Sequence, residues 1–134
     1  MEGKQADMSG ARKTPVDVAE KLKAISKWLE DKKAREPVII DLRGKGAYAD
    51  GIVIVSAGSV RHAQGLAEHV RMQAKAENYE FLHYEGFQTG QWILLDLNDV
   101  LVNIFQPQAR ALYNLEGLWS DAPRMEFQIS AEGR

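Results

Sequence analysis

The sequence predicts one α/β (α+β) sandwich, in which helices flank a mixed five-stranded sheet. Some segments repeat apolar residues at helical spacing, and others are short β-branched apolar runs that end at turn residues. Their order is helix, two strands, helix, three strands and helix, which is typical of helices packed on a sheet. A chain of 134 residues can bury the core of one domain. We expect a disordered leader at 1–13, the domain at 14–127 and a flexible tail at 128–134.

The first helix is predicted from a cap and an apolar stripe. Thr14 can cap a helix whose first position is Pro15. Apolar residues follow at helical spacing to about Lys33, namely Val18, Leu22, Ile25 and Leu29. These features predict an amphipathic helix with one buried side.

Two buried strands and a second helix are expected next. The run 37–42 is short, apolar and β-branched, and it ends at Arg43-Gly44. The similar run 51–55 leads to Ser59, which can cap a helix from Val60 to about Ala76. This second strand and helix together form a strand-turn-helix unit.

Three further strands are predicted at 79–85, 91–96 and 100–105. The connections between them are short, which favours an antiparallel meander. Pro107 can open a third helix. Its expected buried side is formed by Ala111, Leu112 and Leu115.

The hairpin formed by the last two strands is apolar on both faces. Strand residues alternate between faces, so Trp92, Leu94 and Asp96 share one face while Ile93 and Leu95 share the other. A sheet of this kind must be covered twice. Helices can cover one face, and the second face is a candidate interaction site because large apolar surfaces in water usually mark one.

Composition excludes several classes of site. The chain has no cysteine, and its three histidines, His62, His69 and His83, are not at a metal-ligand spacing. A net charge of -2 and a pI near 5.9 argue against a broad nucleic-acid-binding surface and suit a basic partner. The sequence has no run long enough to span a membrane and no secretory signal at its start, so we expect a cytoplasmic protein.

One segment resembles a nucleotidyltransferase in layout. A strand, Gly58-Ser59 and a helix could place backbone N–H groups against a phosphate. Such an enzyme also needs two carboxylates close downstream to hold magnesium, whereas 60–74 contains only Glu68. A capped helix after a strand is the favoured interpretation, and we predict no catalytic residue and no metal or cofactor.

Other polar residues have structural and functional interpretations. Asp96 and Asp99 flank a turn, where they can bond to the backbone or meet a basic partner. His62, beside Arg61, has no candidate nucleophile to activate. Trp119 lies among leucines and is expected in the core.

In several motifs, in the same order, the sequence resembles the ribosomal silencing factors, also called Iojap-related proteins. The resemblance spans about 16–127. The matching motifs are Asp41-Leu42-Arg43-Gly44, Ala49-Asp50, Ser59-Val60-Arg61-His62, Glu85-Gly86, Trp92 through Asp96, Asp99-Val100, Arg110, Tyr113, Leu115-Glu116, Leu118-Trp119 and Asp121-Ala122-Pro123. Each motif is short, but together they are specific.

The chain departs from the family's pattern at four places. Gly51-Ile52 replaces an aromatic pair, the glycine of the 56–59 turn is displaced, and Asn103 replaces a histidine. Asn98 replaces a turn glycine, and because asparagine tolerates the left-handed conformation, we expect the hairpin to persist.

The resemblance implies binding rather than catalysis. It implies a translation repressor that binds the large ribosomal subunit at ribosomal protein L-fourteen and blocks joining of the small subunit. It also implies a nucleotidyltransferase-like fold without the metal carboxylates and, in many members, a homodimer. The alternatives are an assembly factor for the large subunit or a nucleotidyltransferase-like enzyme. The predicted contact residues are Trp92, Leu94, Asp96, Asp99 and Glu85, and the motif residues without an assigned role are Asp50, Ser59, Arg61, His62 and Trp119. For Trp92, the core and a dimer interface are the alternatives to the contact with the partner.

Overall fold

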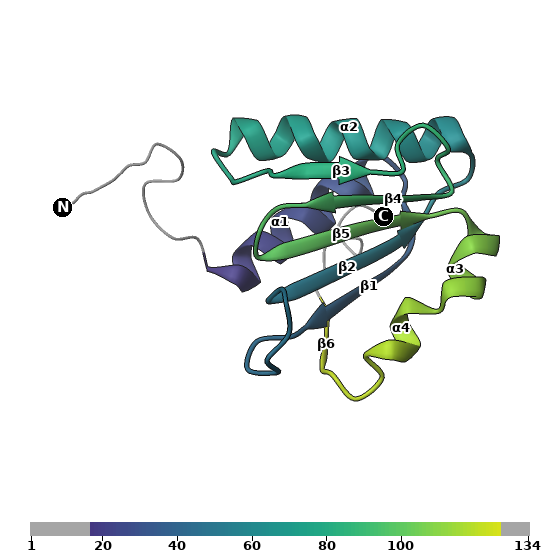
Figure 1. Cartoon of the computed structure of the whole chain (residues 1–134). Coiled ribbons are helices and arrows are strands. Elements are labelled where there is room, and N and C mark those ends of the chain that lie inside the picture. The colour runs from purple at the N-terminus through teal and green to yellow at the C-terminus, as the bar shows by residue number, and fades with distance from the viewer. Residues whose placement is uncertain (1–16, 127–134) are drawn as a thin grey trace.

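The computed structural model describes residues 17–126, which form a six-stranded mixed sheet with helices on both faces (Figure 1). The elements in chain order are α1 (Val18–Asp31), β1 (Arg35–Asp41), β2 (Gly51–Ser56), α2 (Val60–Ala76), β3 (His83–Glu85), β4 (Trp92–Asp96), β5 (Val100–Phe105), α3 (Pro107–Tyr113), α4 (Leu115–Leu118) and β6 (Arg124–Met125). The strand order is β3-β4-β5-β2-β1-β6. Among the strands of residues 17–126, only β2 and β5 pair in parallel.

The predicted α/β class and mixed sheet are confirmed, but the count of five strands was wrong. The sixth strand, β6, has two residues and pairs with Ile39 and Ile40 of β1. A strand this short shows no alternation in the sequence, so nothing local predicts it. The third predicted strand, 79–85, is shorter in the structure and begins at His83.

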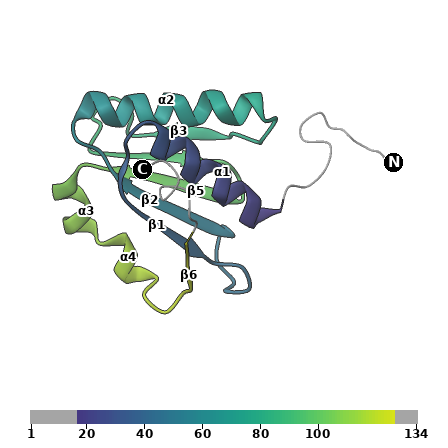
Figure 2. The same cartoon turned by 180° about the vertical axis from the view of Figure 1, so that it is seen from behind.

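Helices α1 and α2 cover one face of the sheet, as Figures 1 and 2 show from opposite sides. Their apolar stripes meet the inward side chains of four strands in the larger core cluster, which includes Leu22, Leu66, Val53, Leu95 and Val102. Each of these side chains is fully buried. Burial of apolar surface on this scale is the main stabilising contribution to the fold.

The start of α1 differs from the prediction. Asp17 is the N-cap residue, and its side chain accepts a hydrogen bond from the backbone N–H of Glu20. Thr14 and Pro15 lie outside the described residues, as do the predicted leader and tail. The cap of α2 is confirmed, because Ser59 Oγ accepts from the His62 N–H at 3.0 Å.

Helices α3 and α4 lie on the other face of the sheet, where a smaller core cluster includes Ile40, Ile54 and Phe105. The predicted buried side of α3 was wrong for Ala111 and Leu112, whereas Leu115 is half-buried and packs against this smaller cluster. The helix buries Ala109 and Arg110, whereas Ala111 and Leu112 are exposed and Leu115 belongs to α4. No helix within residues 17–126 is long and apolar enough to cross a membrane.

Candidate functional site

The second face of the sheet is only partly covered. Register places Glu85, Leu94 and Asn103 in one row across β3, β4 and β5, and His83, Asp96 and Leu101 in the next. Directly paired residues share a face, so all six side chains lie opposite the α1–α2 layer. We call these two rows the open face. His83 and Glu85 are exposed, and Leu94 and Leu101 are half-buried.

Trp92 lies at the border of the open face and is held on three sides. Its ring centroid is 4.9 Å from the ring centroid of Phe105 and 4.9 Å from that of Tyr113. Its indole Nε1–H donates to Oδ1 of the buried Asn103 at 2.9 Å. Trp92 is half-buried, so it packs against the residues of the open face and also borders solvent.

The polar part of the open face is acidic. Asp96 is buried, and its Oδ1 accepts from the Asn98 backbone N–H at 2.9 Å, which confirms the predicted turn bond. Its Oδ2 lies 4.0 Å from His83 Nδ1, and His83 Nε2 lies 3.0 Å from Glu85 Oε2. The face therefore presents the Glu85 carboxylate and the His83 imidazole to solvent, with the buried Asp96 carboxylate and two half-buried leucines beside them.

Asp99 is not brought together with the other four predicted contact residues. Its carboxylate accepts from Lys21 Nζ, which is fully buried beneath the β4–β5 turn. Lys21 also donates to the Leu97 carbonyl at 3.1 Å and lies 5.3 Å from the Tyr79 ring centroid. Asp99 thus holds α1 to the hairpin, on the opposite side from the open face.

The motif residues of unassigned role have mostly structural contacts. His62 accepts from the Gly58 N–H at its Nδ1 and donates from Nε2 to the Lys32 carbonyl, 2.8 Å away, so it joins the end of α1 to the start of α2. Arg61 and Asp50 are exposed. Trp119 packs against the smaller core cluster, as predicted.

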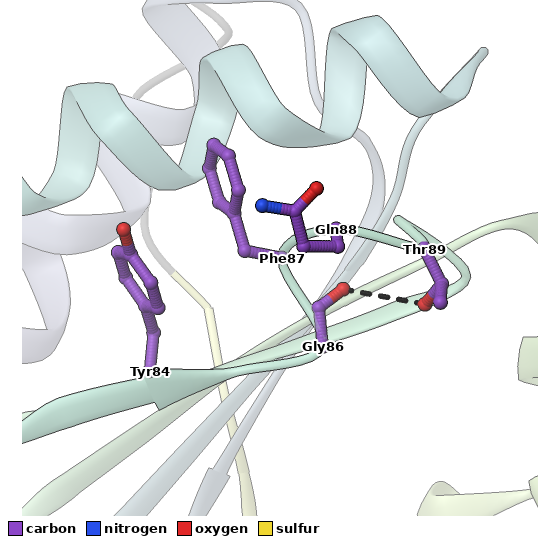
Figure 3. Close-up of a pocket in the computed structure, with 5 residues that line it drawn as sticks. All are labelled: Tyr84, Gly86, Phe87, Gln88 and Thr89. Carbon is purple, nitrogen blue, oxygen red and sulfur yellow. Dashed lines mark hydrogen bonds between the residues drawn. The ribbon is translucent and has the colours of Figure 1, made fainter.

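Two features of the described part of the chain bear on metal binding and catalysis, namely the grouping of its His, Asp and Glu side chains and a hollow in its surface. No group of three His, Asp or Glu side chains there could hold a metal ion. A shallow hollow of about 290 Å³ is lined by Tyr84, Gly86, Phe87, Gln88 and Thr89 (Figure 3). In this view Phe87 and Gln88 point toward α2, away from the open face. The lining contains no acid, no base and no activated nucleophile.

Sequence reasoning missed two buried cations. Lys21 lies beside Leu22 in the apolar stripe of α1. A charged residue within that stripe was the feature of the sequence that could have indicated a buried cation. Arg110 is buried under α3, where Nη1 donates to Ser56 Oγ at 2.8 Å while Nε and Nη2 donate to Glu116 Oε2. Its position in a family motif was the only signal for Arg110.

Comparison with known proteins identifies the family. The sequence pattern described as "Ribosomal silencing factor during starvation" matches residues 15–134. The chain belongs to this ribosomal silencing factor family. The resemblance predicted from its motifs is confirmed.

Individual members of the ribosomal silencing factor family and their relatives agree with this placement. A ribosomal silencing factor from Halalkalibacterium halodurans is 36% identical over 100 residues, which cover 75% of this chain and 86% of that protein. A crystal structure of a Bacillus halodurans protein, 33% identical, has a TM-score of 0.71 and covers 81% of this chain and 99% of the other. A Mus musculus protein named "Mitochondrial assembly of ribosomal large subunit protein 1" is 27% identical over 69% of this chain and 42% of its own length.

Proposed function

We propose that this protein represses translation by binding the large ribosomal subunit at ribosomal protein L-fourteen, where it sterically blocks joining of the small subunit. The observation that carries the proposal is the open face, an acidic and apolar surface that α1, α2, α3 and α4 leave partly uncovered. Membership of the ribosomal silencing factor family supports the ribosome as the partner. We expect the protein to act in the cytoplasm.

The chemistry of the open face suits a basic protein. Glu85 and Asp96 can accept charge-assisted hydrogen bonds from arginine or lysine, and Leu94 and Leu101 supply the apolar area that interfaces bury at their centre. A partner that itself binds RNA carries the positive charge this face would meet. Of the predicted contact residues, Trp92, Leu94, Asp96 and Glu85 lie on or beside the face, and Asp99 would act through the turn that it fixes.

A nucleotidyltransferase-like enzyme is the rival from a different class. The proposal includes a nucleotidyltransferase-like topology but not the enzyme activity. The support for the topology is that β2, residues 57–59 and α2 form a strand-turn-helix unit. The one acid in 60–74 is Glu68, which pairs with Arg71 at 2.7 Å, so the magnesium carboxylates are missing from that segment. Heat released on titration with a nucleoside triphosphate and magnesium would contradict a purely binding role.

A role in assembling large ribosomal subunits is favoured by one specific observation, the name of the related mouse protein. An assembly factor should bind immature particles and leave mature ones, whereas a silencing factor should bind mature subunits. The two functions are therefore separated by the particle that retains the protein. A homodimer is compatible with either.

The test is sucrose-gradient sedimentation of the purified chain with mature large subunits, followed by addition of small subunits at a magnesium concentration that normally drives joining. We expect co-migration with the large subunit and loss of the joined peak. Migration at the top of the gradient with joining intact would reject the proposal.

The charge contribution can be tested at Glu85, which is exposed and lies on the open face. Glu85→Lys should weaken binding by about tenfold at low salt and by less at high salt, because salt screens such charge pairs. Glu77→Lys is a matched control, since Glu77 is an exposed acid at the end of α2. An equal loss at all salt concentrations would contradict a charge contact.

A further inference from the structure

The two helices between β5 and β6 expose three large apolar side chains. Leu112 and Tyr113 of α3 are 75% and 56% exposed, and Leu118 of α4 is 72% exposed. All three lie within seven residues of each other in the sequence. We call these three residues the apolar wall.

This outward arrangement is held by specific contacts. The Arg110 side chain, buried under α3, bonds to Ser56 on β2 and to Glu116 on α4. Gln106, the N-cap residue of α3, donates from Nε2 to the Gly90 carbonyl at 3.0 Å. Rotating α3 to bury Leu112 would expose the guanidinium of Arg110 and break its three hydrogen bonds. The exposure of the wall is therefore fixed by these buried and partly buried polar contacts.

The wall adjoins the open face through one aromatic contact. The Tyr113 ring lies 4.9 Å from the ring of Trp92, which in turn bonds to Asn103 of the open face. Tyr113 is thus the outer member of the aromatic group that also contains Trp92 and Phe105. The acidic rows and the apolar wall meet at this group.

We propose that the apolar wall is the second half of the same docking surface, and that Tyr113 rather than Trp92 is the aromatic side chain that contacts the partner. This inference rests on the proposed function. The occupant that fits is a protein surface with apolar side chains next to arginine or lysine, because the wall is apolar and the open face beside it is acidic. Tyrosine is enriched among the residues that contribute most to binding energy. Tyr113 is exposed and its ring packs against Trp92.

The decisive variant is Leu112→Ser with Leu118→Ser, because both side chains are mostly exposed and their loss should leave folding intact. We expect it to weaken binding of the full chain to isolated large subunits by about tenfold or more, with an unchanged thermal midpoint. Met72→Ser is the control, since Met72 is 60% exposed on α2, and it should bind like the wild-type chain. Tyr113→Ala, which removes the ring, should also weaken binding by about tenfold.

The outcomes separate the two proposals. If the wild-type chain does not bind large subunits, the proposed function fails and this inference fails with it. If the wild-type chain binds and the double variant binds equally well, only the inference is overturned. If sedimentation velocity shows that the double variant loses self-association but keeps ribosome binding, the wall belongs to a second copy of this chain, which also overturns the inference.

Discussion

The contacts of Trp92 bear on whether this residue serves stability or binding. From the sequence it was a candidate anchor for the partner, with the core and a dimer interface as alternatives. In the structure its indole N–H is bonded to a buried amide and its ring is packed between two others. These contacts favour a supporting role for Trp92 beneath the exposed Tyr113.

Replacing Trp92 should therefore destabilise the folded protein. Trp92→Ala should lower the free energy of unfolding by about 2 to 3 kcal/mol, because it removes two ring contacts and a hydrogen bond. Trp92→Phe should cost about 1 to 2 kcal/mol, since Asn103 Oδ1 loses its donor. Urea denaturation measures both values. Tyr48→Ala, which alters an 85% exposed ring, should change stability by less than about 0.5 kcal/mol.

A finding of lost ribosome binding with unchanged stability in Trp92→Ala would contradict this interpretation. It would make Trp92 the solvent-facing anchor that the sequence suggested.

The buried Lys21 and the half-buried Asp99 form the ion pair that fixes the hairpin turn. Removing one partner leaves the other charge uncompensated, which costs more than the pair contributes. Lys21→Met or Asp99→Asn should each lower the free energy of unfolding by about 2 to 4 kcal/mol. The double variant should be less destabilised than the sum of the two single variants, and a double-mutant cycle measured by urea denaturation gives the coupling. Additive losses would show that the two side chains do not interact.

At the scale of elements, the loop between β3 and β4 depends on a glycine. Gly86 has a φ of +79°, and a Cβ at this position would clash with the carbonyl oxygen of Trp92. The Glu85-Gly86 motif is explained by this close approach of two backbones. Gly44, in the β1–β2 loop, has the same φ of +79° but open space around it.

The two glycines make a matched comparison. Gly44→Ala should cost about 1 to 2 kcal/mol, which is the cost of placing a side chain in the left-handed region. Gly86→Ala should cost at least about twice that, because the clash adds to the same backbone cost. Thermal or urea unfolding of the two variants measures the difference. Equal losses would mean that the loop moves away from Trp92 at little cost.

At the scale of the whole molecule, stability should depend on pH through His69. Burial lowers the pKa of His69, and the positive charge of Lys32 lowers it further, while Asp31 opposes the shift. The unfolded chain, with a pKa near 6.5 at this residue, then binds the proton more readily than the folded chain. Stability should therefore fall as the pH decreases through about 6.5, and the loss should be complete below the folded pKa.

The measurement is the free energy of unfolding between pH 5 and 8 for the wild-type chain and His69→Gln. We expect a shallower pH dependence in the variant, because the other titrating groups are unchanged. Identical slopes would show that His69 does not contribute.

The alternation of side chains along β4 and β5, the cap of α2 at Ser59 and the family itself could all be predicted from the sequence. The replacement of the turn glycine by Asn98 could also be interpreted, since this residue adopts the expected left-handed conformation with a φ of 77°. The strand alternation, the helix cap and the turn depend on residues only a few positions apart, because backbone periodicity, capping and turn conformation are local. The family is indicated by several motifs in order along the chain. The sequence therefore determined most elements and the two-faced character of the hairpin.

Only the tertiary structure decided which charges are free and which helix side is buried. Lys21 and Asp99 are 78 positions apart, and Arg110 and Ser56 are 54 apart. Such pairs form when distant elements pack together, and no local pattern encodes them. The same holds for β6, whose two residues become a strand by pairing with β1. The candidate site was therefore predicted at Trp92, Leu94, Asp96 and Glu85, whereas the structural role of Asp99 and the exposure of Tyr113 depend on long-range packing.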